Sequence, residues 1–217
     1  MVLERVQSVR GELVLRRVGE HYEVISNGTF LMDTRNGQSE RLLVNAALGR
    51  SDSPALVLIG GLGVGYSLVA ALRDDRVSRV EVVEIEPAIR DWHCTHLAGF
   101  TRQAFHDERS EIIIDDLLGH LRESDRRYDV ICLDIDNGPD WTVTPDNAAL
   151  YGEDGTALVA SRLAAGGVLS VWSAARSPSY EAVLRRRFER VEVLEIEVPR
   201  GEPDVVVVAR CPRGVRR

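Results

Sequence analysis

The chain contains no lysine, because all 27 of its basic residues are arginine. This absence excludes mechanisms that need a lysine side chain, namely a Schiff base with pyridoxal phosphate, the lysine of a Walker A loop and a kinase-type lysine. Arginine codon bias in a GC-rich genome explains the composition without a functional cause. The enzyme classes that remain use neither a lysine nucleophile nor a lysine-bound nucleotide phosphate.

Long apolar runs are also absent. No run approaches the roughly 20 residues of a transmembrane helix, and residues 1–11 carry Glu4, Arg5 and Arg10 without the apolar centre of a secretory signal. The 217 residues are 44% apolar and 28% charged, as in ordinary soluble globular proteins, and the net charge is −7. We therefore expect a cytoplasmic protein without a membrane-spanning segment.

Cysteines are few and widely spaced. Cys94, Cys132 and Cys211 include no CxxC pair, which argues against a disulfide framework or a structural zinc site, and we interpret them as small buried apolar residues. The segment W-H-C-T-H places His93 and His96 three residues apart, but it has no HExxH glutamate and no third ligand nearby. No metal site is expected.

The chain changes texture at G-R-S-D-S-P, residues 49–54, where turn formers gather. Residues 1–50 are predicted to be a β-rich N-terminal element with strands at 12–17, 22–26 and 29–33, and Asn27-Gly28 is a strong hairpin signal. Residues 51–217 alternate short apolar runs with amphipathic stretches. That alternation is typical of a parallel sheet with helices on both faces.

Residues 51–217 are predicted to form a Rossmann-like α/β domain. The expected strands are 55–59, 80–85, 111–114, 128–133, 167–172, 191–196 and 205–209, and the expected helices are 66–73, 87–97, 117–123, 155–164 and 179–187. P-R-G-E-P-D is too short for a crossover helix, so the last two strands should pair antiparallel at the sheet edge. Parallel strands ending in such a hairpin are typical of the class I methyltransferase sheet.

A glycine-rich turn follows the first strand of this domain. Gly61, Gly63 and Gly65 form GxGxG, which allows the backbone to approach a ligand and directs amide groups at it. A dinucleotide-type GxGxxG needs a small residue where this chain has Tyr66. The pattern favours a nucleoside without pyrophosphate, such as S-adenosylmethionine, although a simple chain reversal uses the same residues.

Acidic residues end the next two strands. Glu84 lies about 20 residues beyond the glycines, where an acidic side chain binds ribose hydroxyls, and its alternative role is to cap the helix that begins at Pro87. Asp115 and Asp116 end the third strand, where a carboxylate can accept from the exocyclic amine of adenine. Asp116 is equally suited to cap the following helix.

The fourth strand ends in D-I-D-N-G-P-D-W, residues 134–141. Asp134 and Asp136 are the candidate catalytic residues, because carboxylates at the mouth of the cleft can orient and deprotonate an amine. Asp134 directly follows an apolar strand and should be largely desolvated. Trp141 and Tyr151 are candidates for an aromatic wall around the substrate, or else ordinary packing residues.

Together these motifs resemble the spermidine synthase family, the polyamine aminopropyltransferases, over nearly the whole chain. In chain order they are S-N-G-T-F-L-M-D with N-G-Q-S-E-R, L-V-L-I-G-G-L-G-V-G, V-E-V-V-E-I-E-P, Y-D-V-I-C-L-D and L-A-A-G-G-V-L. The resemblance implies that Glu84 binds the ribose, that Asp115 binds the adenine, and that Asp134 orients or deprotonates the attacking amine. It also implies that Gln38 is a substrate residue and that two chains associate as a homodimer.

Three departures from the family pattern bear on activity. Gly63 stands where the synthases carry an aspartate that meets the amino group of the decarboxylated cofactor. D-I-D-N-G-P replaces their D-S-T-D-P turn, with Asp136 as the substitute for its second aspartate, and residues 43–47 replace Y-H-E-M and its acid. A diamine needs acids along its length, because a buried unpaired ammonium is costly.

Three functional hypotheses follow. The leading one is a transferase that uses S-adenosylmethionine or its decarboxylated form to move a methyl or aminopropyl group to a small acceptor, an amine, activated at Asp134. The alternative is a non-catalytic adenosyl-nucleoside-binding or regulatory protein with the same fold. Nucleic-acid methylation rests only on Arg185–Arg187, Arg190 and the arginines of the tail, and the acidic chain argues against a nucleic-acid partner.

Overall fold

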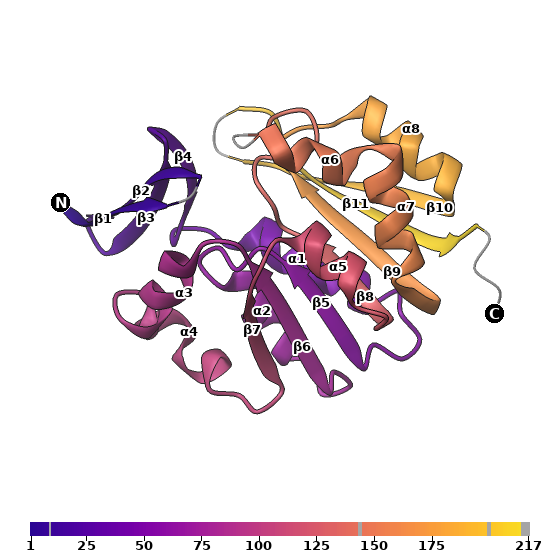
Figure 1. Ribbon diagram of the computed structural model, residues 1–217, viewed down its shortest axis with the longest axis horizontal. Helices are drawn as coiled ribbons and strands as arrows, with labels where there is room; N and C mark the ends of the chain where they lie inside the picture. The colour runs from indigo at the N-terminus through magenta and orange to yellow at the C-terminus, as the bar shows by residue number, and fades with distance from the viewer. Residues whose placement is uncertain (9, 143–144, 199–200, 214–217) are drawn as a thin grey trace.

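The structure, a computed structural model, describes residues 1–8, 10–142, 145–198 and 201–213. Arg216 and Arg217 of the basic tail lie outside these residues. Figure 1 shows a small sheet standing beside a larger, helix-covered one. The small sheet is antiparallel, in the order β1 (Val2–Ser8), β2 (Gly11–Val18), β3 (His21–Ser26) and β4 (Thr29–Asp33). The three strands predicted in this region are confirmed, and β1 was not predicted.

The large sheet has the predicted Rossmann-like α/β architecture. Its strands are β5 (Leu56–Gly60), β6 (Arg79–Glu84), β7 (Ser110–Ile114), β8 (Tyr128–Leu133), β9 (Leu163–Ser173), β10 (Phe188–Ile196) and β11 (Asp204–Pro212), in the order β10-β11-β9-β8-β5-β6-β7. β11 pairs antiparallel with both β9 and β10, whereas all the pairs among β5 to β9 are parallel. The predicted C-terminal hairpin is therefore confirmed, with β10 at the edge.

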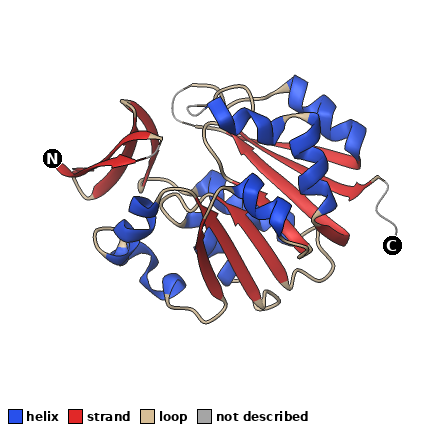
Figure 2. Cartoon of the chain, in the orientation of Figure 1, coloured by secondary structure: helices blue, strands red, loops and turns tan. Residues whose placement is uncertain are grey.

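Helices cover both faces of the large sheet, as Figure 2 shows. One face carries α1 (Gln38–Leu48), α2 (Tyr66–Leu72), α3 (Pro87–Cys94) and α4 (Ala98–Phe105); the other carries α5 (Leu117–Glu123), α6 (Ala148–Tyr151), α7 (Glu153–Ser161) and α8 (Pro178–Arg187), with the short 3₁₀ helix η1 (Pro145–Asn147) before α6. Among the described residues, no helix is long and apolar enough to cross a membrane.

Two details of the predicted elements are corrected. The helix expected over 87–97 is two helices, because α3 ends at Cys94 and α4 begins at Ala98. Of the three cysteines interpreted as buried, only Cys132 is buried; Cys94 is exposed and Cys211 is partly exposed. The geometry at Thr95 ends the first helix with φ of −122° and ψ of −93°.

The valine run of β11 shows why the large sheet is buried on both sides. Val206 and Val208 pack in the core with α1, while Val205 and Val207 pack in the core with α7 and α8. Because successive side chains of a strand point to opposite faces, a strand covered on both faces must be apolar throughout. The same rule explains the unbroken apolar runs that predicted the other strands.

Helix α1 joins the small sheet to the large one. It packs on β8, β9 and β11, and the Ser170 hydroxyl donates to the Leu43 carbonyl oxygen at 2.8 Å. Leu13 and Leu15 of the small sheet belong to the same core as Leu43. The division of the chain near residue 50 stays a prediction; the small sheet itself ends at Asp33.

Replacing Leu43 by alanine should destabilise the protein by about 2–5 kcal/mol, because the side chain is fully buried between α1 and the sheet. Urea unfolding checks this. The matched control is Asn45→Ala on the exposed side of α1, which should change stability by less than about 0.5 kcal/mol. Equal stability of the two variants would contradict this packing of α1.

Candidate active site

The carboxyl ends of the parallel strands bring the predicted site residues together. The Gly61 N–H donates to the Val83 carbonyl at 2.9 Å, and the Asp134 N–H donates to the Gly60 carbonyl at 2.8 Å. On the other side of β6, the Asp115 N–H donates to the Glu84 carbonyl at 3.0 Å. The glycine turn and the acids after β6, β7 and β8 therefore share one edge of the sheet, where ligands of open α/β sheets bind.

Two cavities meet at this edge. We call the first the inner pocket, and its lining includes Arg10, Gly61, Glu84, Asp115, Asp116 and Asn147. We call the second the outer cleft, and its lining includes Phe30, Glu40, Tyr66, Trp141, Trp172 and Asp204. Met32, Gly63, Asp134 and Asp136 line both. Groups bound in the two cavities would therefore face each other at Asp134.

The glycine turn has the close backbone contacts that its residues predict. A Cβ on Gly61 would lie 2.2 Å from the Asp134 carbonyl oxygen, so no other residue fits there. Gly65 begins α2 with a φ of 90°, and a Cβ on it would lie 2.4 Å from Cγ2 of Thr101. Both positions need glycine for steric reasons. The turn can therefore hold its backbone directly against the cavities.

A buried histidine forms a hydrogen bond with the backbone of the glycine turn. His93 Nε2 lies 2.9 Å from the Gly63 carbonyl oxygen, and its Nδ1 lies 2.7 Å from the Thr101 hydroxyl. Because a carbonyl only accepts, Nε2 carries the proton and the Thr101 hydroxyl donates to Nδ1. Burial lowers the pKa of His93 and so favours this neutral form.

The W-H-C-T-H segment thus has packing and docking roles. Trp92 Nε1 donates to one carboxylate oxygen of Glu4 at 2.8 Å, and His96 Nε2 lies 2.8 Å from the other. These contacts tie β1 to the region of α3. Within the part of the chain that the structure describes, no three His, Cys, Asp or Glu side chains are grouped as a metal site.

Glu84 both faces the inner pocket and fixes the glycine turn. Its Oε2 accepts from the Leu62 N–H at 2.9 Å and its Oε1 accepts from the Glu86 N–H at 2.8 Å. Burial raises the pKa of Glu84, against the opposing effect of these hydrogen bonds. Each carboxylate oxygen has a second lone pair, so Glu84 can also accept from a ligand hydroxyl.

Asp115 and Asp116 line the inner pocket and also have local partners. Asp116 Oδ1 accepts from the Gly119 N–H at 2.9 Å, so it caps α5, the alternative that its sequence position offered. Asp115 Oδ1 accepts from the Asp116 N–H at 2.8 Å, and its side chain is exposed. A role for either residue in binding adenine stays a prediction.

The pKa of Asp134 is strongly raised. Burial raises its pKa from 3.8 to about 7; the nearby charge of Glu40 adds to the rise, with smaller contributions from Asp204 and Glu84. The Ser67 hydroxyl donates to its Oδ2 at 2.8 Å and opposes the shift. The carboxyl therefore changes charge near neutral pH, which suits a general base.

Two acids of the outer cleft were missed in the sequence. Glu40, on the first turn of α1, and Asp204, at the start of β11, both line the cleft. Burial raises the pKa of both carboxyls. Asp204 could have been found by topology, because an antiparallel strand begins at the edge where its parallel neighbours end. Glu40 required the unpredicted helix α1.

The three residues predicted to contact substrate lie in different surroundings. Trp141 lines the outer cleft and is 59% exposed. Gln38 is exposed at the start of α1, and the neighbouring Ser39 and Glu40 line the cleft instead. Tyr151 is buried against Tyr180, and its hydroxyl donates to the Ile135 carbonyl at 2.7 Å. Tyr151 therefore stabilises the segment after Asp134 through a hydrogen bond to its backbone.

The segment after β8 turns sharply and is tied to its neighbours. Asp136 has a φ of 62°, and its Oδ1 accepts from the Asn137 N–H at 3.1 Å. The Ala174 N–H donates to the Asn137 carbonyl at 3.1 Å, which joins this segment to the one after β9. Asn137 and Ala174 both line the outer cleft. The wall of the cleft is therefore built from two connected segments.

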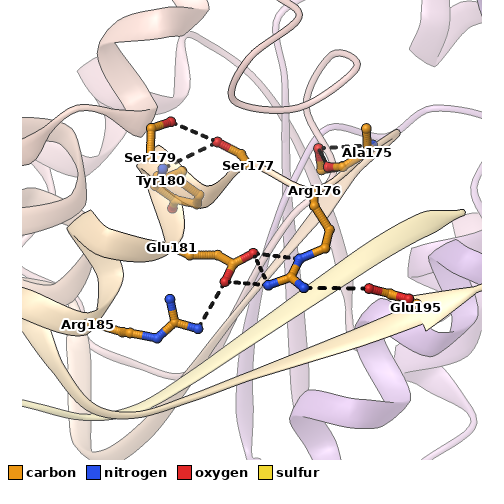
Figure 3. A network of polar contacts seen from close by, with 9 residues as sticks. Ala175, Arg176, Ser177, Ser179, Tyr180, Glu181, Arg185 and Glu195 are labelled. Carbon is orange, nitrogen blue, oxygen red and sulfur yellow. Dashed lines mark hydrogen bonds and ion pairs between the residues drawn. The ribbon is translucent and has the colours of Figure 1, made fainter. Parts of the chain in front are cut away.

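An ion-pair network around one buried carboxylate anchors that wall (Figure 3). Glu181 of α8 is only 2% exposed and accepts from Arg176 at 2.9 Å and from Arg185 at 2.9 Å. Ser177 caps α8 by accepting from the Tyr180 N–H at 3.3 Å. Because a buried carboxylate needs its partners, this network fixes the path of the chain from β9 into α8.

Comparison with known proteins identifies relatives. The family model of the spermine/spermidine synthase domain matches residues 38–192. The polyamine aminopropyltransferase 2 of Pseudomonas aeruginosa is 34% identical over 134 residues, covering 60% of this chain and 36% of the relative. The polyamine aminopropyltransferase of Aeropyrum pernix is 28% identical over 202 residues, covering 86% of this chain and 61% of the relative. The chain thus spans less than two thirds of the length of either relative.

Solved structures share the fold. A spermidine synthase in complex with the transition-state analogue AdoDATO superposes with a TM-score of 0.80 at 19% identity, covering 96% of this chain and 73% of that one. The human methyltransferase-like protein 13, in complex with SAH, superposes with a TM-score of 0.65 at 22% identity, covering 82% of this chain and 85% of that one. The class I methyltransferase-like sheet is confirmed.

Replacing His93 by leucine should weaken binding of methylthioadenosine about 3–10-fold, because the Gly63 carbonyl loses a buried hydrogen bond of about 1 kcal/mol. His93→Gln keeps an N–H donor and should bind close to the unaltered protein. Calorimetric titration measures both affinities. Equal affinity of all three proteins would show that His93 does not position the turn.

Replacing Asp134 by asparagine should raise the melting temperature. A carboxyl with a raised native pKa makes the protein lose stability as pH rises from about 4, the unfolded value, to about 7, and the loss is constant above that. The asparagine has no such titration, so the gain in melting temperature should grow between pH 4.5 and 7.5. The exposed Asp125→Asn is the control and should show no such growth. A pH-independent gain would contradict the raised pKa.

Proposed function

The chain belongs to the spermine/spermidine synthase family, and we propose that it transfers an aminopropyl group from decarboxylated S-adenosylmethionine to a small amine with more than one positive charge. The observation that carries this proposal is the position of Asp134, which lines both the inner pocket and the outer cleft. A base at that position reaches an acceptor in one cavity and a reacting carbon in the other.

The inner pocket fits the nucleoside part of such a cofactor. Glu84 offers carboxylate lone pairs to ribose hydroxyls, and Asp115 offers an acceptor for the adenine amine. Ile85, Leu117 and Ile135 supply apolar surface for the base. The spermidine synthase that binds AdoDATO has the same fold, which supports an adenosyl ligand here.

The outer cleft fits a cationic acceptor. Glu40, Asp136 and Asp204 bring carboxylates to it. Arg35 also lines the cleft, but its positive charge is paired with Asp33 and Glu23. Trp141, Trp172 and Tyr66 add aromatic surface, which suits both methylene groups and ammonium groups. The curated relatives are polyamine aminopropyltransferases, which supports a polyamine as acceptor.

The proposed chemistry is a direct displacement. When bound, decarboxylated S-adenosylmethionine supplies a carbon beside its sulfonium sulfur, and that carbon–sulfur bond breaks as the acceptor nitrogen bonds to the carbon and methylthioadenosine leaves. Asp134 orients the acceptor amine and takes its proton. Glu40 and Asp204, which raise the pKa of Asp134 in the free protein, hold a second ammonium of the acceptor. Most of the rate then comes from positioning, with proton removal adding to it.

Methyl transfer from the parent cofactor is the second candidate. It is favoured by Gly63, which lines both cavities and has no side chain to exclude the cofactor's carboxylate. A non-catalytic nucleoside-binding protein is the third. The homodimer, the cytoplasmic location and the lack of a nucleic-acid partner stay predictions.

Product analysis separates these candidates. Purified protein is incubated with 1,4-diaminobutane and either form of the cofactor, and released nucleosides are identified by mass spectrometry. Methylthioadenosine formed only with decarboxylated cofactor and diamine supports the proposal. If the parent cofactor yields S-adenosylhomocysteine, the protein is a methyltransferase and the proposal is wrong. If the cofactor binds and no product forms, the protein is a non-catalytic nucleoside-binding protein.

Replacing Glu40 by glutamine should shift the pH profile of kcat/KM for the diamine. Asp134 must be ionised to act as a base, so activity rises with pH through its pKa in the free enzyme. Removing the neighbouring negative charge lowers that pKa, and the acidic limb should move to lower pH while KM for the diamine rises about tenfold. Glu123→Gln removes the same charge from an exposed site, and it should leave the acidic limb and the KM unchanged. An unmoved limb would contradict the coupling between Glu40 and Asp134.

A further inference from the structure

The small sheet contributes a charged residue to the inner pocket. Arg10 lies between β1 and β2, and its side chain is 19% exposed although it stands on a connection between strands. Its guanidinium lines the inner pocket. Nη1 donates to Asn147 Oδ1 at 2.9 Å, and Nη2 donates to Asp116 Oδ2 at 3.5 Å.

Asn147 continues this contact to the acceptor side. Its Nδ2 donates to Asp136 Oδ2 at 2.9 Å. We call Asp116, Arg10, Asn147 and Asp136 the Arg10 bridge. All four residues line the inner pocket, and Asp136 also lines the outer cleft. The bridge thus connects the start of α5, the small sheet, η1 and the segment that follows β8.

The small sheet is docked so that Arg10 is held in place. The Ser8 hydroxyl donates to the carboxylate of Glu86, which follows the predicted ribose-binding strand. Farther along β1, Glu4 accepts from Trp92 and contacts His96. An arginine is always charged and offers several donors in a rigid plane, so it can pair with Asp116 and Asn147 at once.

The charges of the bridge explain what Arg10 does there. The carboxylates of Asp116 and Asp136 line the same pocket. The Arg10 guanidinium contacts Asp116 directly and is linked to Asp136 through the side chain of Asn147. The Asn147 side chain contacts both Arg10 and Asp136, so it is the one residue that separates them in the bridge. A ligand that contacts Arg10 in the inner pocket would therefore act through Asn147 on the position of Asp136, which also lines the outer cleft.

We propose that Arg10 is a positioning residue of the nucleoside site and that the Arg10 bridge couples nucleoside binding to acceptor binding. The inference rests on the proposed function, because it takes an adenosyl nucleoside as the ligand of the inner pocket and a diamine as the ligand of the outer cleft. Binding at one site then strengthens binding at the other by the same factor in both directions.

Calorimetric titration with methylthioadenosine, with and without saturating 1,4-diaminobutane, tests the coupling. In the unaltered protein, we expect the diamine to tighten methylthioadenosine binding by about 5-fold or more. Arg10→Met should weaken methylthioadenosine binding about tenfold and abolish the effect of the diamine. Asn147→Ala should keep most of the nucleoside affinity and still lose the effect of the diamine.

Arg5→Met is the matched control, because Arg5 lies on β1, close to the turn that carries Arg10, and pairs with Glu12 away from the pocket. It should behave as the unaltered protein. If Arg10→Met melts earlier than Arg5→Met, Asn147→Ala alone decides, since it leaves the docking contacts of Ser8 and Glu4 in place. Coupling retained in Asn147→Ala and Arg10→Met would overturn the inference while the nucleoside site stands. No binding of methylthioadenosine to the unaltered protein would contradict the proposed function itself, and the inference with it.

Discussion

The desolvated carboxyl of Asp134 is the constraint on which the rest of the site depends. It is held at the end of β8, a strand inside the large sheet, because its N–H donates to the Gly60 carbonyl. Taking an ionised carboxylate out of water is costly, and the cost appears as a pKa raised to about 7. Perturbed pKa values cluster at functional sites, which supports the proposed role of Asp134 as a base.

The neighbours of Asp134 make its charge adjustable. Glu40 and Asp204 stand in the same cleft and disfavour its ionisation, while the Ser67 hydroxyl favours it. A cationic acceptor in the outer cleft would neutralise those acids and lower the pKa of Asp134 at the moment when the base is needed. At pH 7 the free enzyme would hold this carboxyl about half protonated, and the bound acceptor would favour its ionised form.

The sequence predicts the parts of the fold that depend on local pattern. Apolar runs such as the valines of β11, the glycine turn and the acids after β6 to β8 all follow from strand periodicity and from the rule that ligands bind at the carboxyl edge. The missed residues depend on tertiary structure. Arg10 reaches the inner pocket because β1 docks through Glu4, and Glu40 reaches the cleft on α1, a helix that was not predicted. Gln38, which was chosen by resemblance, is exposed at the start of α1, two residues before Glu40.

The pKa of Asp134, followed by ¹³C NMR of its carboxyl carbon, is the most direct test. In the free protein the account predicts a midpoint of about 7. With methylthioadenosine and 1,4-diaminobutane bound together, the midpoint should fall, because the acceptor's positive charge then faces the cleft acids. A midpoint near 4 in the free protein, the value of an ordinary exposed aspartate, would contradict the central claim that burial raises the pKa of this carboxyl to near neutrality.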